Sequence, residues 1–454
     1  MNIVLLSGGS GKRLWPLSND IRSKQFIKLF DIPNHTKSST LPHNNCDQIS
    51  PEKESMLQRV YRQIKEVSPS ANITIGTSKS QVSSIHNQIG NDVNICVEPC
   101  RRDTFPAIAL LTSYLSDVKG LSRNESVVVC PVDPYVNNDY FEALTQLDYL
   151  AKTQAANLIL MGIEPTYPSE KYGYIIPSTK ETVTTVNTFK EKPNLETAQK
   201  YIEQGALWNG GVFAFQLGYL LDIAHSLIDF TTYEDLLSKY HSIEKISFDY
   251  AVVEKEKDIK VARFAGEWKD IGTWNTLTEE MSEPIIGKGV CDTACEDVHI
   301  INELNIPIVC MNLQKTIVCA SPDGILISEK EHSSYIKPYV DKIEQQIMFA
   351  EKSWGSFQIL DIEPTSITLK VTLNPNQKMN YHSHEHRDEV WTIISGEGDV
   401  IIDGVKKPVK TGDVIHLPAH SKHTIISRFE LKLIEVQSGL DITVKDKKIY
   451  EFPQ

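Results

Sequence analysis

The stretch NIVLLSGGSGKR, residues 2–13, decides the fold of the first half of the chain. Residues 2–6 are apolar enough to form one short buried strand, which the following Ser and Gly residues end abruptly. Glycines in such a turn let the backbone pass close to a phosphate and present its N–H groups to it. Taken alone, the turn is equally compatible with a flexible Gly-Ser connection. The spacing excludes a P-loop, because Arg13 stands where that motif needs Ser or Thr.

Outward from this stretch, short apolar runs alternate with segments of helical periodicity. The apolar runs lie at 93–97, 126–130 and 157–163, and the helical segments at 55–67, 105–117 and 140–154. Buried strands alternating with amphipathic helices are typical of an α/β domain with a mixed, mainly parallel sheet. We expect this domain to cover residues 1–280, with a long polar loop at 32–52.

The pattern of apolar and turn residues changes twice after this domain. Residues 281–345 contain short strand-like runs between turn residues and predict a β-rich connecting region, with a helical segment at 333–349. From 346 to 454 nearly every apolar run has strand character, as in SITLKVTL (366–373). Regularly spaced strands with Gly, Pro and Asp turns predict a closed all-β barrel or a sandwich.

Bulk composition narrows the class of protein. The 454 residues are 41% hydrophobic and 23% charged, which suits two or three globular domains. A net charge of -13 argues against a nucleic-acid binder, although a phosphate pocket needs only a few local cations. No apolar run is long enough for a transmembrane helix. The cysteines form no CxxC pair, and Cys96, Cys130, Cys310 and Cys319 lie in strand-like runs, so we expect reduced thiols and a cytoplasmic protein.

The longer string that begins in the same stretch, GGSGKRLWPLSNDIRSKQF (residues 8–26), carries a resemblance to a known family. It resembles the signature GGxG-[ST]-RLWPLSxxxxPKQF of bacterial mannose-1-phosphate guanylyltransferases, the long type with a C-terminal cupin. Ordered matches continue over essentially the whole chain, at Glu98-Pro99, Thr104, Pro106–Ala109, Pro131–Asp133, Tyr172–Ile175, Phe189–Pro193, Trp208–Phe213, Phe248–Ala251 and Trp268–Trp274. The resemblance implies a Rossmann-like nucleotidyltransferase domain at 1–280, the connecting region at 281–345 and a cupin barrel at 346–454.

The resemblance also implies a reaction, in which a sugar 1-phosphate oxygen attacks the α-phosphorus of a nucleoside triphosphate and expels pyrophosphate. Because the attacking group is already an anion, positioning and charge neutralisation matter most, and Mg²⁺ on carboxylate oxygens suits that task. The implied catalytic residues are Arg13, Lys24, Asp133, Lys192 and Asp270, with Asp133 and Asp270 holding Mg²⁺. The implied nucleotide-binding residues are Leu6, Gly8, Gly9, Gly11, Lys12, Arg13, Lys24, Glu98, Arg102 and Thr104. The implied sugar phosphate contacts are Gly173, Glu191, Lys192 and Asn209.

The leading functional expectation is formation of GDP-mannose from GTP and mannose 1-phosphate, for polysaccharide synthesis, by a homodimer. Departures from the family pattern keep the base and the sugar open, because Arg101 and Asp103 replace Gly and Asn in a segment that borders the nucleotide. Lys12, Ser23 and Pro134 depart as well. One alternative is the same chemistry on another sugar 1-phosphate or another base. The other is a non-catalytic sugar-nucleotide sensor.

The tail contains a histidine pattern that predicts a second metal site. The spacing His382-x-His384-x₄-Glu389 resembles the first cupin motif, and the segment ending at His423 resembles the second. Alternate residues of a strand share a face, so His382 and His384 are expected to point into the barrel. Three histidines and one carboxylate suit Zn²⁺, Mn²⁺, Fe²⁺ or Ni²⁺.

The same domain carries phosphomannose isomerase activity in the family, and the resemblance makes that activity an expectation here. Arg387 is retained from the family's metal motif and is a candidate for holding a substrate phosphate. His382 and Val390 stand where the family has Gln and His. A cupin kept for binding or for oligomer contacts is therefore the alternative.

Overall fold

The computed structural model describes residues 1–9, 12–19, 21–33, 53–344, 346–440, 442–443 and 446–452. The chain divides into two compact units. The first contains Met1–Gly9, Gln25–Val82 and Gln88–Gly272, and the second contains Ser10–Lys24, Ser83–Asn87 and Thr273–Gln454. The expected boundaries between three domains stay predictions. No helix among the described residues is both long and apolar enough to span a bilayer.

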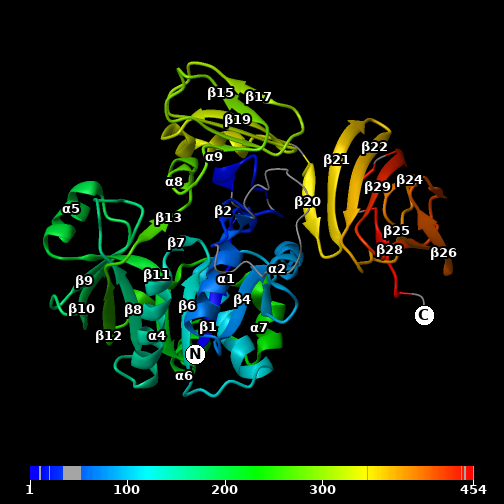
Figure 1. Ribbon diagram of the computed structural model, residues 1–454. Helices are drawn as coiled ribbons and strands as arrows, with labels where there is room; N and C mark the ends of the chain where they lie inside the picture. The colour runs from blue at the N-terminus through cyan, green and yellow to red at the C-terminus, as the bar shows by residue number, and fades with distance from the viewer. Residues whose placement is uncertain are drawn as a thin grey trace. The chain divides into compact units, whose positions relative to one another are not determined.

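The first unit is built on a mixed sheet whose strands, in the described chain, run in the order β5-β4-β1-β6-β11-β8-β12-β10-β9, with helices packed around it (Figure 1). The strands are β1 (Asn2–Leu6), β4 (Asn72–Ser78), β5 (Asn94–Glu98), β6 (Ser126–Pro131), β8 (Leu158–Ile163), β9 (Tyr174–Pro177), β10 (Val183–Lys190), β11 (Leu207–Gln216) and β12 (Ile259–Phe264). β1 pairs in parallel with β4 and β6, while β11 runs antiparallel to β6 and β8. The α/β class and the mixed sheet are confirmed, but the sheet is not mainly parallel, because β10 and β11 pair antiparallel with each of their described neighbours.

The α-helices of the described chain up to residue 239 are α1 (Met56–Val67), α2 (Val82–Ile89), α3 (Thr104–Ser113), α4 (Asn138–Lys152), α5 (Leu195–Glu203), α6 (Leu217–Leu227) and α7 (Tyr233–Lys239). The predicted helical segments 55–67, 105–117 and 140–154 correspond to α1, α3 and α4, whereas the other four helices were not predicted, and residues 83–87 of α2 belong to the second unit. α1 begins with a capping box, in which the Ser55 hydroxyl accepts from the Gln58 N–H and the Gln58 side chain accepts from the Ser55 N–H. Its buried face carries Leu57, Val60 and Ile64, the spacing of one helical stripe.

The register of the parallel strands determines where a ligand can bind. Leu6, the last residue of β1, lies opposite Gly76 of β4 and Pro131 of β6. The carboxyl ends of these strands therefore meet at one edge, which is where open α/β sheets bind ligands. A short antiparallel pair outside the main sheet, β7 (Pro134–Val136) with β13 (Trp268–Asp270), starts directly beyond β6.

The connecting region of the second unit is a stack of short strands. β14 (Ile285–Ile286), β16 (His299–Asn302) and β18 (Thr316–Ser321) pair in parallel, with β19 (Gly324–Glu329) antiparallel at the edge. β15 (Gly289–Cys291) pairs in parallel with β17 (Ile308–Cys310). The short helix α8 (Trp274–Thr278) precedes these strands.

The predicted helical segment at 333–349 is wrong in extent. The structure has a 3₁₀ turn at His332–Tyr335, a short helix α9 (Lys337–Val340), and then strand β20 (Phe349–Lys352). Pro338 lies in the first turn of α9, where a missing N–H is tolerated, but it could not lie inside a helix that continued from residue 333.

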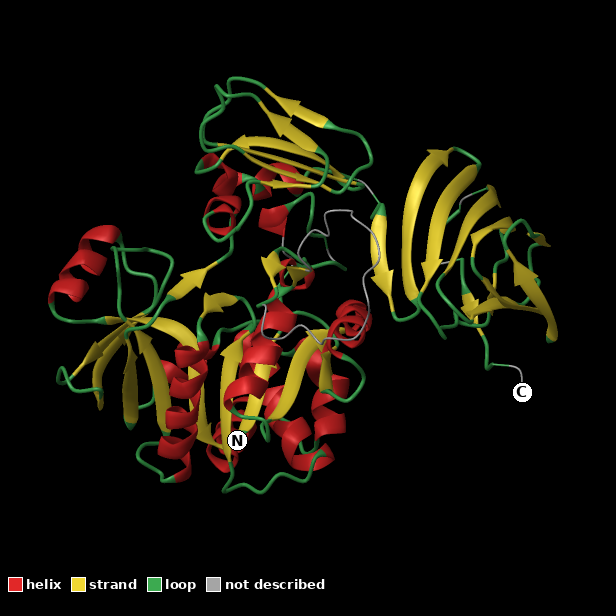
Figure 2. Cartoon of the chain, in the orientation of Figure 1, coloured by secondary structure: helices red, strands yellow, loops and turns green. Residues whose placement is uncertain are grey.

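The C-terminal part of the second unit is built of two facing sheets and consists almost entirely of strands (Figure 2). One sheet runs β20-β21-β22-β29-β24-β27 and the other β26-β25-β28-β23-β30. Their bounds are β21 (Gly355–Glu363), β22 (Ser366–Leu373), β23 (His382–Ser383), β24 (Arg387–Ser395), β25 (Glu397–Ile402), β26 (Val405–Lys410), β27 (Val414–Leu417), β28 (His423–Ser427), β29 (Leu431–Gly439) and β30 (Lys448–Ile449). Fully buried Leu373, Trp391, Ile425 and Leu433 fill the space between the sheets.

Candidate functional site

A cavity of about 390 Å³ lies at the carboxyl ends of the parallel strands of the first unit. The glycine turn forms one wall, and Gly9 has a φ of +117°, which favours glycine. The turn is fastened from two sides, since Ser7 N–H donates to Gly76 O at 2.9 Å and Arg101 Nη2 donates to Gly9 O at 3.0 Å. The predicted nucleotide residues that line the cavity are Leu6, Gly8, Gly9, Glu98 and Thr104, with Asp133 at its far side.

Glu98 is held rigidly at this cavity through one of its two oxygens. Its Oε1 accepts a hydrogen bond from Arg102 N–H at 3.0 Å and another from Tyr240 OH at 2.9 Å. Burial is the main reason that the pKa of Glu98 is raised, and these two hydrogen bonds counteract it. The arginine side chain that lines the cavity is that of Arg101, whereas Arg102 contributes its backbone to Glu98.

A second pocket, of about 250 Å³, shares a wall with the first. Pro131, Asp133 and Gly211 line both, so the two cavities meet at Asp133. Asp270 lines the second pocket as well, because the pairing of β13 with β7 places Asp270 opposite Pro134, the neighbour of Asp133. The two aspartates, far apart in sequence, therefore reach the same pocket. Two carboxylates at one small pocket fit the oxygen ligands that Mg²⁺ prefers.

Aromatic side chains form another wall of the second pocket. Tyr172 and Trp268 line it, with ring centroids 5.5 Å apart, and Trp208 packs against Tyr172 at 4.9 Å. The indole nitrogen of Trp268 is buried and has no hydrogen-bond partner within the described residues. Such a buried N–H usually bonds to an ordered water or to a ligand.

The predicted sugar phosphate residues form a group of two hydrogen-bonded pairs, Lys192 with Glu191 and Asn209 with Gly173. Lys192 pairs with the carboxylate of Glu191, and Asn209 lies at the second pocket. Asn209 N–H donates to Gly173 O at 2.8 Å, and its side chain donates to Asp249 Oδ1 at 2.7 Å. A Cβ on Gly173 would stand 2.6 Å from a Glu191 carboxylate oxygen. A side chain at position 173 would therefore crowd Glu191, and the contact of Gly173 with the sugar phosphate stays a prediction.

Asp249 belongs to this group although no role had been assigned to it. It lines the nucleotide cavity, and burial with the nearby charge of Glu191 raises its pKa to about 6. Arg101, Tyr172 and Trp268 were missed in the same way. Asp249, Tyr172 and Trp268 lie in segments that match the family, and those matches were the signal that could have found them.

Four of the predicted nucleotide ligands, Gly11, Lys12, Arg13 and Lys24, belong to the second unit. Arg13 and Lys12 lie in a 3₁₀ turn at Lys12–Leu14, and Lys24 begins another at Lys24–Phe26. Lys12 Nζ lies 2.8 Å from Asp341 Oδ1. Gly11 lies outside the described residues. The roles of all four toward the nucleotide stay predictions.

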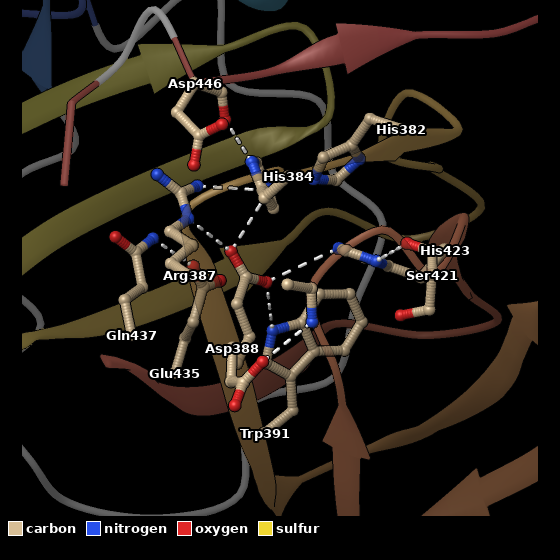
Figure 3. Close-up of polar contacts among 12 residues, drawn as sticks. His382, His384, Arg387, Asp388, Trp391, Ser421, His423, Glu435, Gln437 and Asp446 are labelled. Atoms are coloured by element: carbon tan, nitrogen blue, oxygen red, sulfur yellow. Dashed lines mark hydrogen bonds and ion pairs between the residues drawn. The ribbon is translucent and has the colours of Figure 1, made fainter. Parts of the chain in front are cut away.

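The cupin histidines converge as the spacing predicted (Figure 3). His382, His384 and His423 are buried, and one ligand atom from each lies within 4.8 Å of the other two. Glu389 comes from the opposite sheet, with Oε1 3.1 Å from His384 Nε2 and Oε2 3.4 Å from His423 Nε2. Burial lowers the pKa of His382 from its usual value to about 2.

Each histidine has its other ring nitrogen against a backbone carbonyl. Nδ1 of His382 lies 2.7 Å from Asn380 O, Nδ1 of His423 lies 3.0 Å from Ser421 O, and Nδ1 of His384 contacts Asp446 O. An Nδ1–H that donates to a carbonyl leaves Nε2 as the metal-binding lone pair. The buried Nε2 of His423 makes no hydrogen bond within the described residues, so the set fits a metal ion.

Arg387, the candidate phosphate holder, faces these ligands. Its Nε donates to Glu389 Oε1 at 3.0 Å and its Nη2 lies 3.1 Å from His384 Nε2. A guanidinium bonded to a ligating carboxylate fixes that carboxylate's orientation.

The cysteines described by the structure are free thiols, and Cys96, Cys130, Cys310 and Cys319 are buried, as the sequence predicted.

Comparison with known proteins finds a family match in each part of the chain. The nucleotidyl transferase family model matches residues 2–284, and the cupin domain model matches residues 369–437. A mannose-1-phosphate guanylyltransferase of Salmonella montevideo is 26% identical over 480 residues, covering 96% of this chain and 95% of its own. A mannose-1-phosphate guanylyltransferase of Escherichia coli is 27% identical over 466 residues, covering 93% of this chain and 94% of its own.

Among solved structures, one from Thermus thermophilus is described as a mannose-1-phosphate geranyltransferase. It superimposes on this chain with a TM-score of 0.60 and is 25% identical in sequence, and the alignment covers 76% of this chain and 99% of the other. The nucleotidyl transferase model spans more than half of the present chain and includes both cavities of the first unit. The chain therefore belongs to the nucleotidyl transferase family and carries a cupin domain toward its C-terminus.

Proposed function

We propose that the chain transfers a guanylyl group from GTP to mannose 1-phosphate, giving GDP-mannose and pyrophosphate. The observation that carries the proposal is the shared wall of the two cavities. Asp133 lines both of them, and Asp270 lines the second. A nucleotide along the glycine turn and a sugar phosphate beside Asn209 would bring their phosphates together at this wall. The curated relatives named for this reaction cover nearly the whole chain.

In the proposed reaction, an oxygen of mannose 1-phosphate forms a bond to the α-phosphorus of GTP, and the bond from that phosphorus to the bridging oxygen of pyrophosphate breaks. Asp133 and Asp270 would hold Mg²⁺, which supplies charge neutralisation between the two anions. Lys192 would hold the acceptor phosphate in line. Arg13 and Lys24 would balance the triphosphate charge, which favours departure of pyrophosphate.

The proposal includes guanine because of the free oxygen of Glu98. Oε1 is occupied by Arg102 and Tyr240, while Oε2 accepts no hydrogen bond within the described residues. Guanine offers two adjacent donors, N1–H and the 2-amino group, either of which can bond to this one free oxygen. Adenine lacks that pair of donors.

Replacing Glu98 with Gln tests the base assignment. Hydrogen bonds to a charged group contribute about 1.5–3 kcal/mol, so kcat/KM for GTP is expected to fall roughly 10- to 100-fold. In the Glu98→Gln variant, kcat/KM for ITP should fall less than kcat/KM for GTP, because ITP lacks the 2-amino group. The ratio of kcat/KM for GTP to that for ITP should therefore decrease. Steady-state kinetics with both nucleotides measure the change. Glu256→Gln is the matched control, because Glu256 accepts from Tyr219 OH at 2.6 Å without lining either cavity of the site. An unchanged ratio of GTP to ITP in Glu98→Gln would rule out this role.

The substrates are tested by pyrophosphate release with four nucleoside triphosphates, each combined with a panel of hexose and heptose 1-phosphates. GTP with mannose 1-phosphate is expected to turn over fastest. If another pair is preferred, the substrate assignment is wrong while nucleotidyl transfer stands. A sensor would bind the ligands and release no pyrophosphate.

For the cupin we propose a divalent transition metal, Zn²⁺, Mn²⁺, Fe²⁺ or Ni²⁺, held by His382, His384, Glu389 and His423. Its support is the buried convergence of three Nε2-type donors around one carboxylate. Phosphomannose isomerase activity stays a prediction, which formation of fructose 6-phosphate from mannose 6-phosphate would test. The homodimer and the cytoplasmic location stay predictions as well.

A further inference from the structure

The signature loop, residues 12–19 and 21–24, is held by contacts from the connecting region and from Trp274 and Phe349, which flank that region. One of these contacts is a bidentate ion pair, in which Arg22 Nη1 and Nη2 donate to the two Glu303 carboxylate oxygens at 2.9 and 2.8 Å. The guanidinium also lies 5.5 Å from the ring centroid of Phe349. Burial works to lower the pKa of Arg22, yet the charge and hydrogen bonds of Glu303 leave it raised. Arg22 is therefore a fixed cation in a largely enclosed position.

A second contact fixes the turn that precedes Arg22. Asn19 Oδ1 accepts from the N–H groups of Ile21 and Arg22 at 2.9 and 2.7 Å. Its Nδ2 donates to Asp323 Oδ2 at 2.7 Å. Asp323 is buried, and its other oxygen accepts from Met348 N–H at 2.7 Å. Both oxygens of Asp323 are thus used, one of them on the loop.

The start of the loop is held through its backbone and through close packing. Trp274 Nε1 donates to Trp15 O at 3.2 Å, and Ser321 Oγ donates to Pro16 O at 2.6 Å. A Cβ on Gly324 would stand 2.4 Å from the Trp15 ring, at a φ of +148°. The ring therefore fits only because residue 324 has no side chain.

The same loop carries two proposed ligands of the triphosphate. Arg13 lies two residues before Trp15, and Lys24 lies two residues after Arg22. Lys24 is followed by buried Gln25, whose Nε2 donates to Ser7 Oγ at 3.1 Å, beside the glycine turn. The residue that follows the loop is thus fixed by a hydrogen bond within the first unit. Long basic side chains on an unattached loop would lose conformational entropy on each binding event, and a loop held in advance avoids that cost.

We propose that Glu303 and Asp323 are positioning residues for nucleotidyl transfer, acting through Arg22 and Asn19 to hold in one conformation the loop that carries Arg13 and Lys24, the proposed ligands of the triphosphate. The proposal rests on the function proposed above. It gives the connecting region a part in the reaction, beyond joining two domains. Weakening the ion pair should then impair GTP binding more than mannose 1-phosphate binding, because the loop's basic residues serve the triphosphate.

The test compares Glu303→Gln, Arg22→Gln and the double variant with wild type. The KM for GTP is expected to rise about tenfold in each single variant, with little change in the KM for mannose 1-phosphate. The double variant should be no worse than either single, because the same pair is lost in all three. Asp297→Asn is the matched control, since it removes the ion pair of Asp297 with buried Lys330 in the same region without touching the loop.

Two further measurements separate this proposal from the proposed function and from a folding defect. GTP affinity by calorimetry should fall about tenfold in Glu303→Gln, whichever sugar phosphate is the acceptor. If Glu303→Gln does not fold, Arg22→Lys keeps the charge without the paired donors and should raise the KM for GTP severalfold. The proposal is overturned if the loop variants match Asp297→Asn in GTP affinity and kinetics, or if both substrates' KM values and the melting temperature change together.

Discussion

Replacing Asp133 or Asp270 with Asn is expected to lower kcat by about a thousandfold. Loss of a single preorganised electrostatic contact at a reacting centre typically costs a hundred- to a thousandfold in rate, and each aspartate would supply half of a metal's protein ligands. Asn keeps the shape of Asp and removes the charge, so binding of the nucleotide should change much less. Initial rates of pyrophosphate release at saturating substrates measure the loss.

The control and the double variant make this experiment specific. Asp222→Asn, at an exposed ion pair with Arg123, should keep the wild-type rate. The double variant Asp133→Asn/Asp270→Asn should be little slower than either single, because residues that act as one unit are not additive. Either single variant retaining more than a tenth of wild-type kcat would contradict a shared metal site.

Replacing His423 with Ala is expected to abolish stoichiometric metal binding by the cupin. His423 Nε2 is buried, makes no hydrogen bond within the described residues, and lies 3.4 Å from Glu389 Oε2. Loss of partners that merely orient a ligand costs about 10- to 100-fold in metal affinity, so loss of the ligand itself should cost at least about a hundredfold. Metal content by mass spectrometry and affinity by calorimetry measure the effect.

His416→Ala is the control for this experiment, because His416 is an exposed histidine of β27 in the same domain. It should keep the wild-type metal content. Equal metal content in the His423→Ala protein and in wild type would show that the ion binds elsewhere, and the proposed ligand set would be rejected.

The sequence predicted the elements of the first unit better than the contacts between them. Apolar runs and helical periodicity are local signals, and the strands that contain Leu6 and Cys130 lie where they were expected. The pairing of β13 with β7, which brings Asp270 to Asp133, joins segments far apart in the chain. No local pattern encodes that pairing, so the family match alone pointed to it.

The residues that depart from the family pattern also show that tertiary contacts cannot be predicted from the local sequence. Lys12 stands out in the sequence as an extra cation beside the nucleotide, but its ion pair with Asp341 is a tertiary contact that no spacing rule predicts. In the cupin, His382 and His384 are both buried as predicted, although strand β23 ends at Ser383 and Ser383 is buried as well. The contact of His384 with the Asp446 carbonyl comes from the C-terminal segment and could not be read from the strand period.

The central claim is tested most directly by the products that the intact chain forms from GTP and mannose 1-phosphate with Mg²⁺. The account predicts GDP-mannose and pyrophosphate in equal amounts, with formation of both stopped by a chelator and restored by excess Mg²⁺. Binding of both substrates with no pyrophosphate released, or pyrophosphate release that continues after the metal is removed, would contradict it.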